Sequence, residues 1–367
     1  MVVLSQMRAG ARDMTPIRVA VIGGDGIGPE VTEQARRVLE TLSSAGLVSI
    51  GFTEFPHGAD HYLETGETLS DESFARLRDD FDAILFGAVG DSRVPDGRHA
   101  RDLLLGLRFR LDLFLNRRPV KLRAPALSPL RRADEVPIDF VIYRENTESL
   151  YGGIGRLEHE GTPDEVAISE GIASRRAVDR IVRLAFEDAR AAGVRVTLSD
   201  KANAVPHMYG LWRRVFGEIA AEYADVPSEM RYVDALAMEM VRSPERFGII
   251  VTGNLLGDIL SDLGAELIGG PGLAPSANVN PGRHALYEPV HGSAPDLVGT
   301  GQANPMAAVL SAAMLLADHG AKEAAQAVEA AVDAALEEGR TTPDLGGNAS
   351  TAEVGDRLCS GVLEAIG

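Results

Sequence analysis

Short runs of apolar, β-branched residues alternate along this chain with longer segments of helical periodicity. The pattern predicts strands at 17–22, 82–87, 138–143, 194–198 and 247–251, and helices at 30–42, 175–192 and 305–317. Because each helix between two strands carries the chain back to begin the next strand, the alternation predicts an α/β fold with a largely parallel sheet. This constraint on the fold is the strongest that the sequence offers.

Length and charge restrict the class of protein further. With 367 residues, 45% of them hydrophobic, the chain is long enough for two domains or one large α/β unit. The 54 acidic residues outnumber the 36 basic ones, which gives a formal charge of −18. An acidic protein of this kind is a poor partner for nucleic acid or an anionic membrane. No apolar run approaches the roughly 20 residues that span a bilayer.

Cysteine content and the N-terminal segment bear on the compartment. The only cysteine, Cys359, excludes an intrachain disulfide and suits a reducing environment, so we expect a cytoplasmic protein. Residues 1–16 contain two arginines but no continuous apolar stretch, which does not fit a secretory signal. We expect this segment to be a loose extension, with Met7 or Met14 as alternative translation starts.

Two aspartates lie four residues apart in a segment with helical periodicity. Asp258 and Asp262 alternate with leucine and isoleucine at 255, 256, 259, 260 and 263, so both carboxylates fall on one face of a helix. Like charges at this spacing destabilise a helix by about 0.2–0.5 kcal/mol unless a cation lies between them. Carboxylates are ligands of Mg²⁺ and Mn²⁺, so the pair predicts a divalent metal site. Asp234, in an apolar run, also needs a partner, which a metal would supply.

A lysine, a tyrosine and three arginines are further candidates. Lys201 follows a predicted strand and fits a general base if its partners lower its pKa, and otherwise a solvated side chain. Tyr151 precedes two glycines in a predicted loop. Arg108, Arg118 and Arg144 recur in an acidic chain, Arg144 at a strand end, where parallel sheets bind ligands. Three guanidinium groups can hold two carboxylates, although each arginine alone also fits a surface ion pair.

Two loops rich in small residues are candidate cofactor contacts. Gly24, Gly26 and Gly28 follow the first strand, but Pro29 takes the place of the third glycine of the dinucleotide fingerprint. This spacing predicts a tight strand-to-helix turn and not a Rossmann fold. The segment 291–296, His-Gly-Ser-Ala-Pro-Asp, would let a flat ligand approach the backbone, and its acidic residue could accept hydrogen bonds from ribose; a simple turn fits it equally well.

Taken together, these segments resemble the β-decarboxylating dehydrogenases, the family of isopropylmalate, isocitrate, homoisocitrate and tartrate/D-malate dehydrogenases. The resemblance extends from about residue 17 to the C-terminus. It rests on seven motifs in order, namely the glycine loop, 107–119, 144–148, 200–203, the aspartate helix, 291–296 and 303–305.

The resemblance implies a non-Rossmann isocitrate/isopropylmalate dehydrogenase-like fold with two α/β domains. Residues 1–115 and 269–367 would form the cofactor-binding domain, and 116–268 the central domain for substrate binding and dimerisation. It also implies a homodimer with shared active sites. Lys201 and Asp234 would reach the partner's site, while Asp258 and Asp262 would stay with their own.

The same resemblance implies the reaction, which is NAD-dependent oxidative decarboxylation of a 3-substituted (R)-malate with Mg²⁺ or Mn²⁺. Lys201 would be the general base, Tyr151 the proton donor, and Asp234, Asp258 and Asp262 the metal ligands. Substrate binding would involve Asp234, Arg108, Arg118, Arg144, Leu104 and Leu105. The cofactor residues would be His291, Gly292, Ser293, Ala294, Asp296 and Asn304, with the Asp296 carboxylate favouring NAD over the additional phosphate of NADP.

Substrate choice would depend on the helical turn before Arg108. Leu104 and Leu105 suit an alkyl substituent and offer nothing to a third carboxylate, which favours (2R,3S)-3-isopropylmalate, converted to 2-oxoisocaproate in leucine biosynthesis. The segments 144–148 and 274–278 are closer to the tartrate/D-malate type, and Arg117 stands where the family often has leucine. Tartrate/D-malate or another substituted malate, homoisocitrate-like or otherwise anionic, therefore stay open as alternatives. A non-catalytic regulatory subunit is disfavoured, because it would be expected to lose the lysine, tyrosine or metal aspartates.

Overall fold

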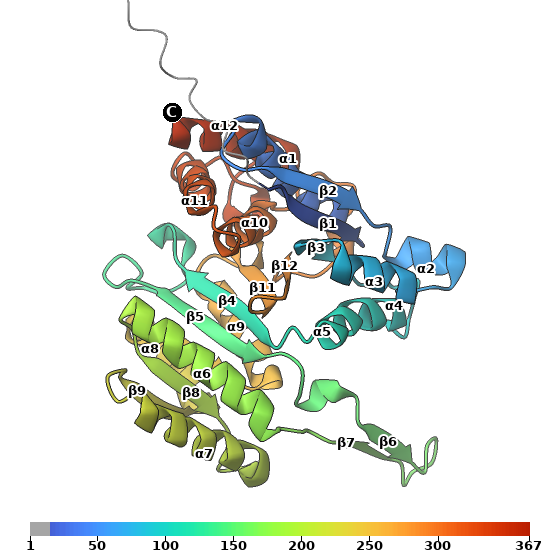
Figure 1. Cartoon of the computed structure of the whole chain (residues 1–367), viewed down its shortest axis with the longest axis vertical. Helices are drawn as coiled ribbons and strands as arrows, with labels where there is room; N and C mark the ends of the chain where they lie inside the picture. Colours follow the sequence, from blue (N-terminus) through green and yellow to red (C-terminus); the bar gives the residue numbers. More distant parts are fainter. Residues whose placement is uncertain (1–14) are drawn as a thin grey trace, which may run out of the picture.

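The computed structural model describes residues 15–367, so the alternative starts Met7 and Met14 lie outside the described residues. A ten-stranded sheet runs through the molecule (Figure 1). In spatial order its strands are β2 (Ile50–Glu54), β1 (Ile17–Gly24), β3 (Ala83–Ala88), β12 (His284–Pro289), β11 (Pro275–Asn280), β4 (Leu115–Lys121), β5 (Asp139–Glu145), β10 (Ile249–Thr252), β8 (Val196–Asp200) and β9 (Ser228–Tyr232). A separate hairpin pairs β6 (Gly155–Glu158) with β7 (Val166–Ser169).

Helices connect most of these strands. They are α1 (Gly28–Ser44), α2 (Ala59–Thr65), α3 (Asp71–Asp79), α4 (Arg98–Ala100), α5 (Gly106–Arg110), α6 (Arg175–Ala192), α7 (Pro206–Glu222), α8 (Val233–Arg242), α9 (Asn254–Leu267), α10 (Met306–Asp318), α11 (Lys322–Glu337) and α12 (Thr351–Ile366). The alternation of strand and helix read from the sequence is therefore confirmed, with boundaries shifted by at most two residues. No helix within residues 15–367 is long and apolar enough to cross a membrane.

Six strand pairs of the ten-stranded sheet are parallel and three are antiparallel, which confirms the predicted largely parallel arrangement and adds an antiparallel centre. Strand pairs on both sides are parallel, from β2 to β12 and from β5 to β9. The central pairs β12–β11, β11–β4 and β4–β5 are antiparallel. Parallel pairs need a crossover helix, whereas antiparallel neighbours do not. Two of the central pairs, β12–β11 and β4–β5, join strands that follow one another in the chain with no α-helix between them, whereas β11–β4 joins strands that are far apart in sequence.

Both ends of the chain meet on one part of the sheet. Helices α1, α10, α11 and α12 pack into one hydrophobic cluster with β1, β3 and β12 (Figure 1). A second cluster joins α6 and α7 to β5, β8 and β10. The sheet continues from one cluster to the other through the β11–β4 pairing. The proposed domain boundaries at 115/116 and 268/269 stay a prediction.

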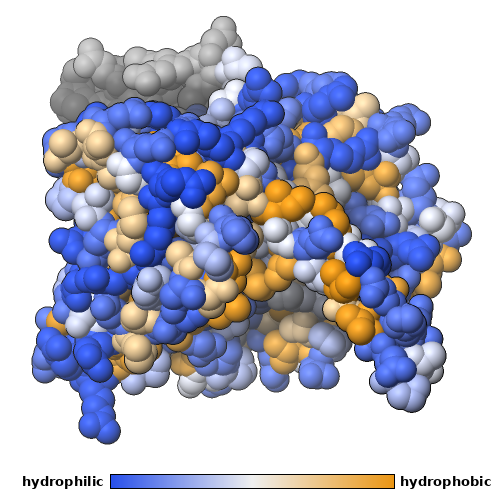
Figure 2. Space-filling view, turned by 90° about the horizontal axis from the view of Figure 1, so that it is seen from below, coloured by the Kyte–Doolittle hydropathy of each residue, from blue (hydrophilic) through white to orange (hydrophobic). Residues whose placement is uncertain are grey.

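The face of the molecule near α7 and the β6–β7 hairpin carries exposed apolar side chains. Figure 2 views this end and shows apolar surface around a hollow near its middle. Large exposed apolar residues occur on α8, on α9 and along the hairpin, among them Met238, Val241, Ile259, Leu157 and Val166. Where such residues form a contiguous patch, they often mark a protein–protein contact.

Candidate active site

Four of the predicted site residues form one cluster around the Asp258 carboxylate. Arg144 Nη1 lies 2.5 Å from Asp258 Oδ1, and Arg118 Nη1 lies 3.5 Å from the same oxygen. Tyr151 donates its hydroxyl proton to Asp258 Oδ2 at 2.6 Å. The arginines come from β4 and β5, the tyrosine from the turn after β5 and the aspartate from α9. Residues more than a hundred positions apart in sequence thus share one carboxylate.

Neighbouring cations determine the charge state of this carboxylate. Burial raises the pKa of Asp258, but the charge of Arg144 and the hydrogen bond from Tyr151 outweigh it, so the pKa lies below its usual range. Burial and the hydrogen bond to Asp258 raise the pKa of Tyr151. At neutral pH Asp258 is therefore ionised and Tyr151 keeps its proton. A phenol that keeps its proton is suited to act as an acid.

The three arginines predicted to bind substrate carboxylates are all buried. Burial, together with the charges of Arg118 and Arg108, lowers the pKa of Arg144 to about 9, and burial also lowers that of Arg118. Arg108 Nη2 donates to Glu288 Oε1 at 2.8 Å. Like charges gathered in a buried place disfavour one another unless anions join them. A dicarboxylate ligand would therefore bind here with charge complementarity.

Lys201 and Asp234 form a separate pair. Lys201 Nζ donates to Asp234 Oδ1 at 2.6 Å, and this hydrogen bond lowers the pKa of Asp234. Neither side chain has a hydrogen bond to the Asp258 cluster in the structure of residues 15–367. The partner that Asp234 was expected to need is a lysine, and the aspartate is exposed instead of buried in an apolar run.

The carboxylate pair on α9 provides hard oxygen donors at one face of a helix. Asp258 and Asp262 both belong to this helix, which confirms the predicted spacing. The Asp262 side chain is 67% exposed, and burial of its remainder raises its pKa. Within residues 15–367, no three acidic, histidine or cysteine side chains gather as a metal site. The donor chemistry of Asp258 and Asp262 fits Mg²⁺ or Mn²⁺, and the third predicted ligand, Asp234, pairs with Lys201 instead of joining them.

The predicted cofactor loop packs directly on the first glycine turn. Ile27 N donates to the carbonyl oxygen of Ser293 at 2.9 Å. A Cβ atom added at Gly26, which has φ 61°, would lie 2.0 Å from that oxygen, so only glycine permits the contact. Ala294 has a φ of 41°, a left-handed conformation that is unusual for alanine. The two small-residue loops of the sequence thus form one surface.

The polar residues predicted to bind the cofactor differ in whether they already have hydrogen-bond partners. His291 Nε2 is buried and has no hydrogen-bond partner within residues 15–367, so it fits a contact to a bound nucleotide. Asp296 is exposed on a short turn. The Asn304 amide, by contrast, donates to Asp344 Oδ2 at 3.0 Å and accepts from Met306 N at 3.0 Å. Asn304 is therefore placed to shape the loop as well as to contact a ligand.

Leu104 and Leu105 lie in the turn that leads into Arg108. The segment Arg101–Leu105 is a π-helical turn joined to α5, where an ordinary helix was expected. π-Turns are often found at functional sites. Both leucines are half-buried, while Leu103 and Leu107 are buried in the hydrophobic core.

A buried amide network behind the arginines was not predicted from the sequence. Asn278 Nδ2 donates to Glu288 Oε1 at 2.7 Å, beside the Arg108 contact to the same oxygen. Asn278 Oδ1 accepts from the amides of Asn116 and Asn146. Buried asparagines on strands are uncommon, so Asn278, which lies between Ala277 and Val279, was the available signal in the sequence; Asn116 is followed by two arginines and gave none.

Asp25, in the glycine turn, was also missed. Its carboxylate accepts from Ala59 N at 2.6 Å and Gly90 N at 2.8 Å, and His99 Nε2 lies 2.8 Å away. Asp25 and His99 are both buried. One carboxylate thus holds three segments around the first strand-to-helix turn.

Replacing Asp25 by alanine should weaken both folding and cofactor binding. Each buried donor left without a partner costs about 1–3 kcal/mol, and this change leaves three. We expect a lower midpoint of urea unfolding and a higher KM for the cofactor that the sequence predicts, NAD. Asp96→Ala is the matched control, because Asp96 contacts only the neighbouring Arg98 at the surface. Equal unfolding midpoints for the two variants would contradict this role of Asp25.

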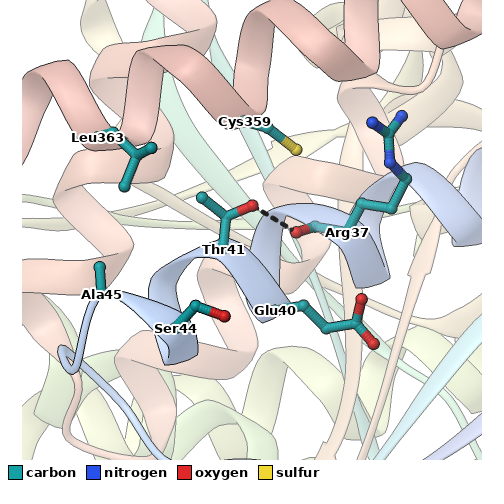
Figure 3. A pocket seen from close by; sticks show the side chains of 7 residues that line it. All are labelled: Arg37, Glu40, Thr41, Ser44, Ala45, Cys359 and Leu363. Carbon is teal, nitrogen blue, oxygen red and sulfur yellow. Dashed lines mark hydrogen bonds between the residues drawn. The ribbon is translucent and has the colours of Figure 1, made fainter.

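One surface groove lies apart from these residues. It has a volume of about 460 Å³ between α1 and α12, and Figure 3 shows its seven lining side chains. The single cysteine, Cys359, lies there half-buried beside Arg37. Thr41 Oγ1 donates to the Arg37 carbonyl oxygen within α1, and none of the predicted site residues lines the groove.

The mixed sheet holds a buried arginine cluster beside carboxylates on a helix, an arrangement suited to binding a dicarboxylate. The chain belongs to the isocitrate/isopropylmalate dehydrogenase family, whose profile matches residues 18–358. It is thus an enzyme of the oxidatively decarboxylating dehydrogenase class. The resemblance read from the motifs and the predicted non-Rossmann fold class are confirmed.

Several relatives cover nearly the whole chain. A 3-isopropylmalate dehydrogenase of Corynebacterium diphtheriae is 46% identical and covers 93% of this chain and 98% of its own length. A probable tartrate dehydrogenase/decarboxylase of Bacillus subtilis is 40% identical, with coverage of 95% and 98%. The crystal structure of isocitrate dehydrogenase from Methylococcus capsulatus has a TM-score of 0.86 and 36% identity, covering 94% of this chain and 99% of that one.

Proposed function

We propose that the protein oxidises and decarboxylates a 3-substituted (R)-malate with NAD as hydride acceptor, and that its preferred substrate is (2R,3S)-3-isopropylmalate, yielding 2-oxoisocaproate for leucine biosynthesis in the cytoplasm. The buried arginine cluster around Asp258 and Tyr151 carries this proposal. Arg108, Arg118 and Arg144 would hold the two malate carboxylates. The half-buried Leu104 and Leu105 precede Arg108 and suit an alkyl substituent.

Acid–base roles follow from the protonation states. A divalent cation held by Asp234, Asp258 and Asp262 would supply Lewis acidity that lowers the pKa of the substrate hydroxyl. Lys201, in its neutral amine form, would accept the hydroxyl proton, and bound NAD would supply the hydride acceptor. Loss of carbon dioxide from the resulting β-keto acid then creates a carbanionic carbon, which Tyr151 protonates. The raised pKa of Tyr151 supports this role, because the phenol is the form present at neutral pH.

The residues for acid–base chemistry are divided between two places in one chain, which supports a dimer. Lys201 and Asp234 pair with each other, apart from the Asp258 cluster. The helices that carry Asp234 and Asp258 also expose apolar side chains, with Met238 62% and Ile259 59% exposed. A second copy docked on α8 and α9 would bury this surface and bring one subunit's Lys201 and Asp234 to the other's Asp258.

The cofactor proposal rests on the surface formed by the two small-residue loops. His291, Gly292, Ser293 and Ala294 would lie against the adenosine, with Asn304 beside them. Burial lowers the pKa of His291, so the imidazole is neutral at pH 7. Its Nδ1 donates to the Gly292 carbonyl oxygen at 2.9 Å, which leaves Nε2 as a hydrogen-bond acceptor. The exposed Asp296 would accept hydrogen bonds from the ribose hydroxyls and repel a 2′-phosphate.

A panel of substituted malates with NAD and Mg²⁺ tests the reaction and the substrate together. Burying an isopropyl group against the leucines contributes roughly 2 kcal/mol, so kcat/KM for 3-isopropylmalate should exceed that for D-malate roughly 30-fold. Nicotinamide absorbance reports the turnover. If no malate is oxidised, the proposed function fails.

The principal alternative is a tartrate/D-malate dehydrogenase. The 40% identical relative named for tartrate supports it, as does the sequence at 144–148. A preference for D-malate or tartrate over isopropylmalate in the same panel would establish this alternative. Turnover of a malate with an anionic substituent alone would point to a specialised paralogue.

A further inference from the structure

A second row of side chains lies directly behind the arginine cluster. Tyr287, Ala277, Arg117 and Tyr143 are aligned as strand partners across β12, β11, β4 and β5. Successive residues of a strand point to opposite faces of the sheet. The polar members of this row are therefore on the face opposite their successors Glu288, Arg118 and Arg144, which belong to the candidate active site.

Two of these back-face residues converge on one carboxylate. Arg117 Nη2 donates to both oxygens of Asp318, at 2.8 and 2.7 Å. Tyr287 donates its hydroxyl proton to Asp318 Oδ2 at 2.8 Å. Ala277 lies between Arg117 and Tyr287 in the row, and its small side chain leaves room for both to reach the same partner. Separately, Tyr143 donates to Asp188 Oδ2 at 2.6 Å.

The negative charge of Asp318 needs a compensating positive charge because of its position in the helix. Asp318 is the last residue of α10, where the helix dipole disfavours a negative charge by about 0.3–1 kcal/mol. The last turn of α10 contains no basic residue. Arg117 from β4 supplies the compensating charge, and both side chains are only 26% exposed, so water screens the pair weakly.

The cleft around the Arg117–Asp318 pair has no excess of positive or negative side chains that would attract a charged ligand. Its volume is about 680 Å³, and it also contains Arg18, Arg78 and Arg283 together with Asp79, Asp82 and Asp188. With Arg117 and Asp318, arginines and aspartates balance, so the lining would not attract a charged small molecule. A structural task for the Arg117–Asp318 pair fits this lining better.

We propose that Asp318 is a positioning residue for the arginine cluster. It ties β4 to β12 from behind the sheet, and so it holds Arg118, which follows Arg117, and Glu288, which follows Tyr287 and binds Arg108. This inference rests on the proposed function, in which those arginines bind the substrate carboxylates. Guanidinium forks bind carboxylates in a defined geometry, and misplacement by about 1 Å can cost about 100-fold in rate.

Steady-state kinetics of Asp318→Asn and Arg117→Gln test the proposal. We expect KM for 3-isopropylmalate to rise at least tenfold, with KM for NAD unchanged, because the cofactor loops are held by other contacts. Arg117→Lys should restore part of the loss, since lysine keeps the charge but not the fork. Arg18→Gln is the matched control, because Arg18 pairs with Asp82 in the same cleft. Equal changes in both KM values, or no change, would overturn the proposal.

Tyr287→Phe provides a milder variant if Asp318→Asn fails to fold. It removes one hydroxyl group, and a smaller rise in substrate KM is expected. Hydrogen exchange separates this proposal from the proposed function, since it needs no turnover. Backbone amides of β4 and β12 should exchange faster in Asp318→Asn than in Arg18→Gln. If the amide exchange rates of β4 and β12 are unchanged in Asp318→Asn, the positioning role is overturned. If these rates are altered but the wild-type protein oxidises no malate, only the proposed function is overturned.

Discussion

Replacing Lys201 by methionine is expected to lower kcat by about 10³-fold, because a positioned general base contributes about 10²–10⁴-fold and methionine cannot accept a proton. The change should leave folding intact. Lys201 and Asp234 are partly exposed, and exposed ion pairs contribute little to the free energy of unfolding. NAD binding should also be unchanged, since the cofactor loops make no hydrogen bond to Lys201 in the structure of residues 15–367. Steady-state kinetics and calorimetric titration with NAD measure these two quantities.

Lys121→Met is the matched control for this variant. Lys121 is also a lysine in an exposed ion pair, with Glu329 at 3.1 Å, but it lies at the end of β4 away from the Asp258 cluster. Its replacement should leave kcat within about twofold of the wild type, as expected for a surface pair. If Lys201→Met retains comparable activity, the assignment of the general base is wrong.

Periodicity was sufficient to predict those parts of the fold that depend on local sequence. The α9 helix is an example, because its apolar residues and the spacing of Asp258 and Asp262 both follow the 3.6-residue repeat. The strands β1, β3 and β5 were equally visible as apolar runs. Such segments are recognisable because a helix buries one of its faces and a central strand buries both of its faces. The apolar pattern that results does not depend on which elements pack against the segment.

The antiparallel centre of the sheet was not predictable in the same way. Strand β11 contains Ser276, Asn278 and Asn280, and these polar residues interrupt the apolar pattern by which strands are recognised. They are accommodated because Asn278 bonds to Glu288 and to other amides inside the molecule. The partners lie in distant segments, so the sequence around β11 alone does not indicate a strand.

The candidate site shows a similar division. Motif spacing predicted which arginines belong together, and the structure brings Arg118 and Arg144 to one carboxylate. It did not predict that Arg117, one residue earlier, binds Asp318 on the opposite face. Which face a strand residue takes depends on register, and a shift by one residue would exchange the two arginines. Register is fixed by pairing with β5 and β11, which lies beyond local sequence.

Mixing two inactive variants should restore activity if the active sites are shared between subunits. Lys201→Met and Asp258→Asn should each abolish turnover, because one lacks the proposed base and the other a proposed metal ligand. In a mixed dimer with shared sites, one site contains both changes and the other contains neither. Random reassociation makes about half of the dimers mixed, so about a quarter of the wild-type activity should return.

The mixing experiment distinguishes shared sites from sites within one subunit, because the latter would each retain one defect and recover nothing. The two variants are dissociated together, reassociated and assayed, with each variant alone taken through the same steps as the control. Asp262→Asn serves as a second partner for Lys201→Met, since its exposed side chain makes a folding defect less of a concern. Recovery with both aspartate variants would establish that Lys201 acts on the neighbouring subunit's carboxylates. If reassociated dimers recover no activity with either aspartate variant, Lys201 acts in the site of its own subunit. The Lys201–Asp234 pair, which is apart from Asp258 in the structure, would then have to move towards Asp258 within one chain.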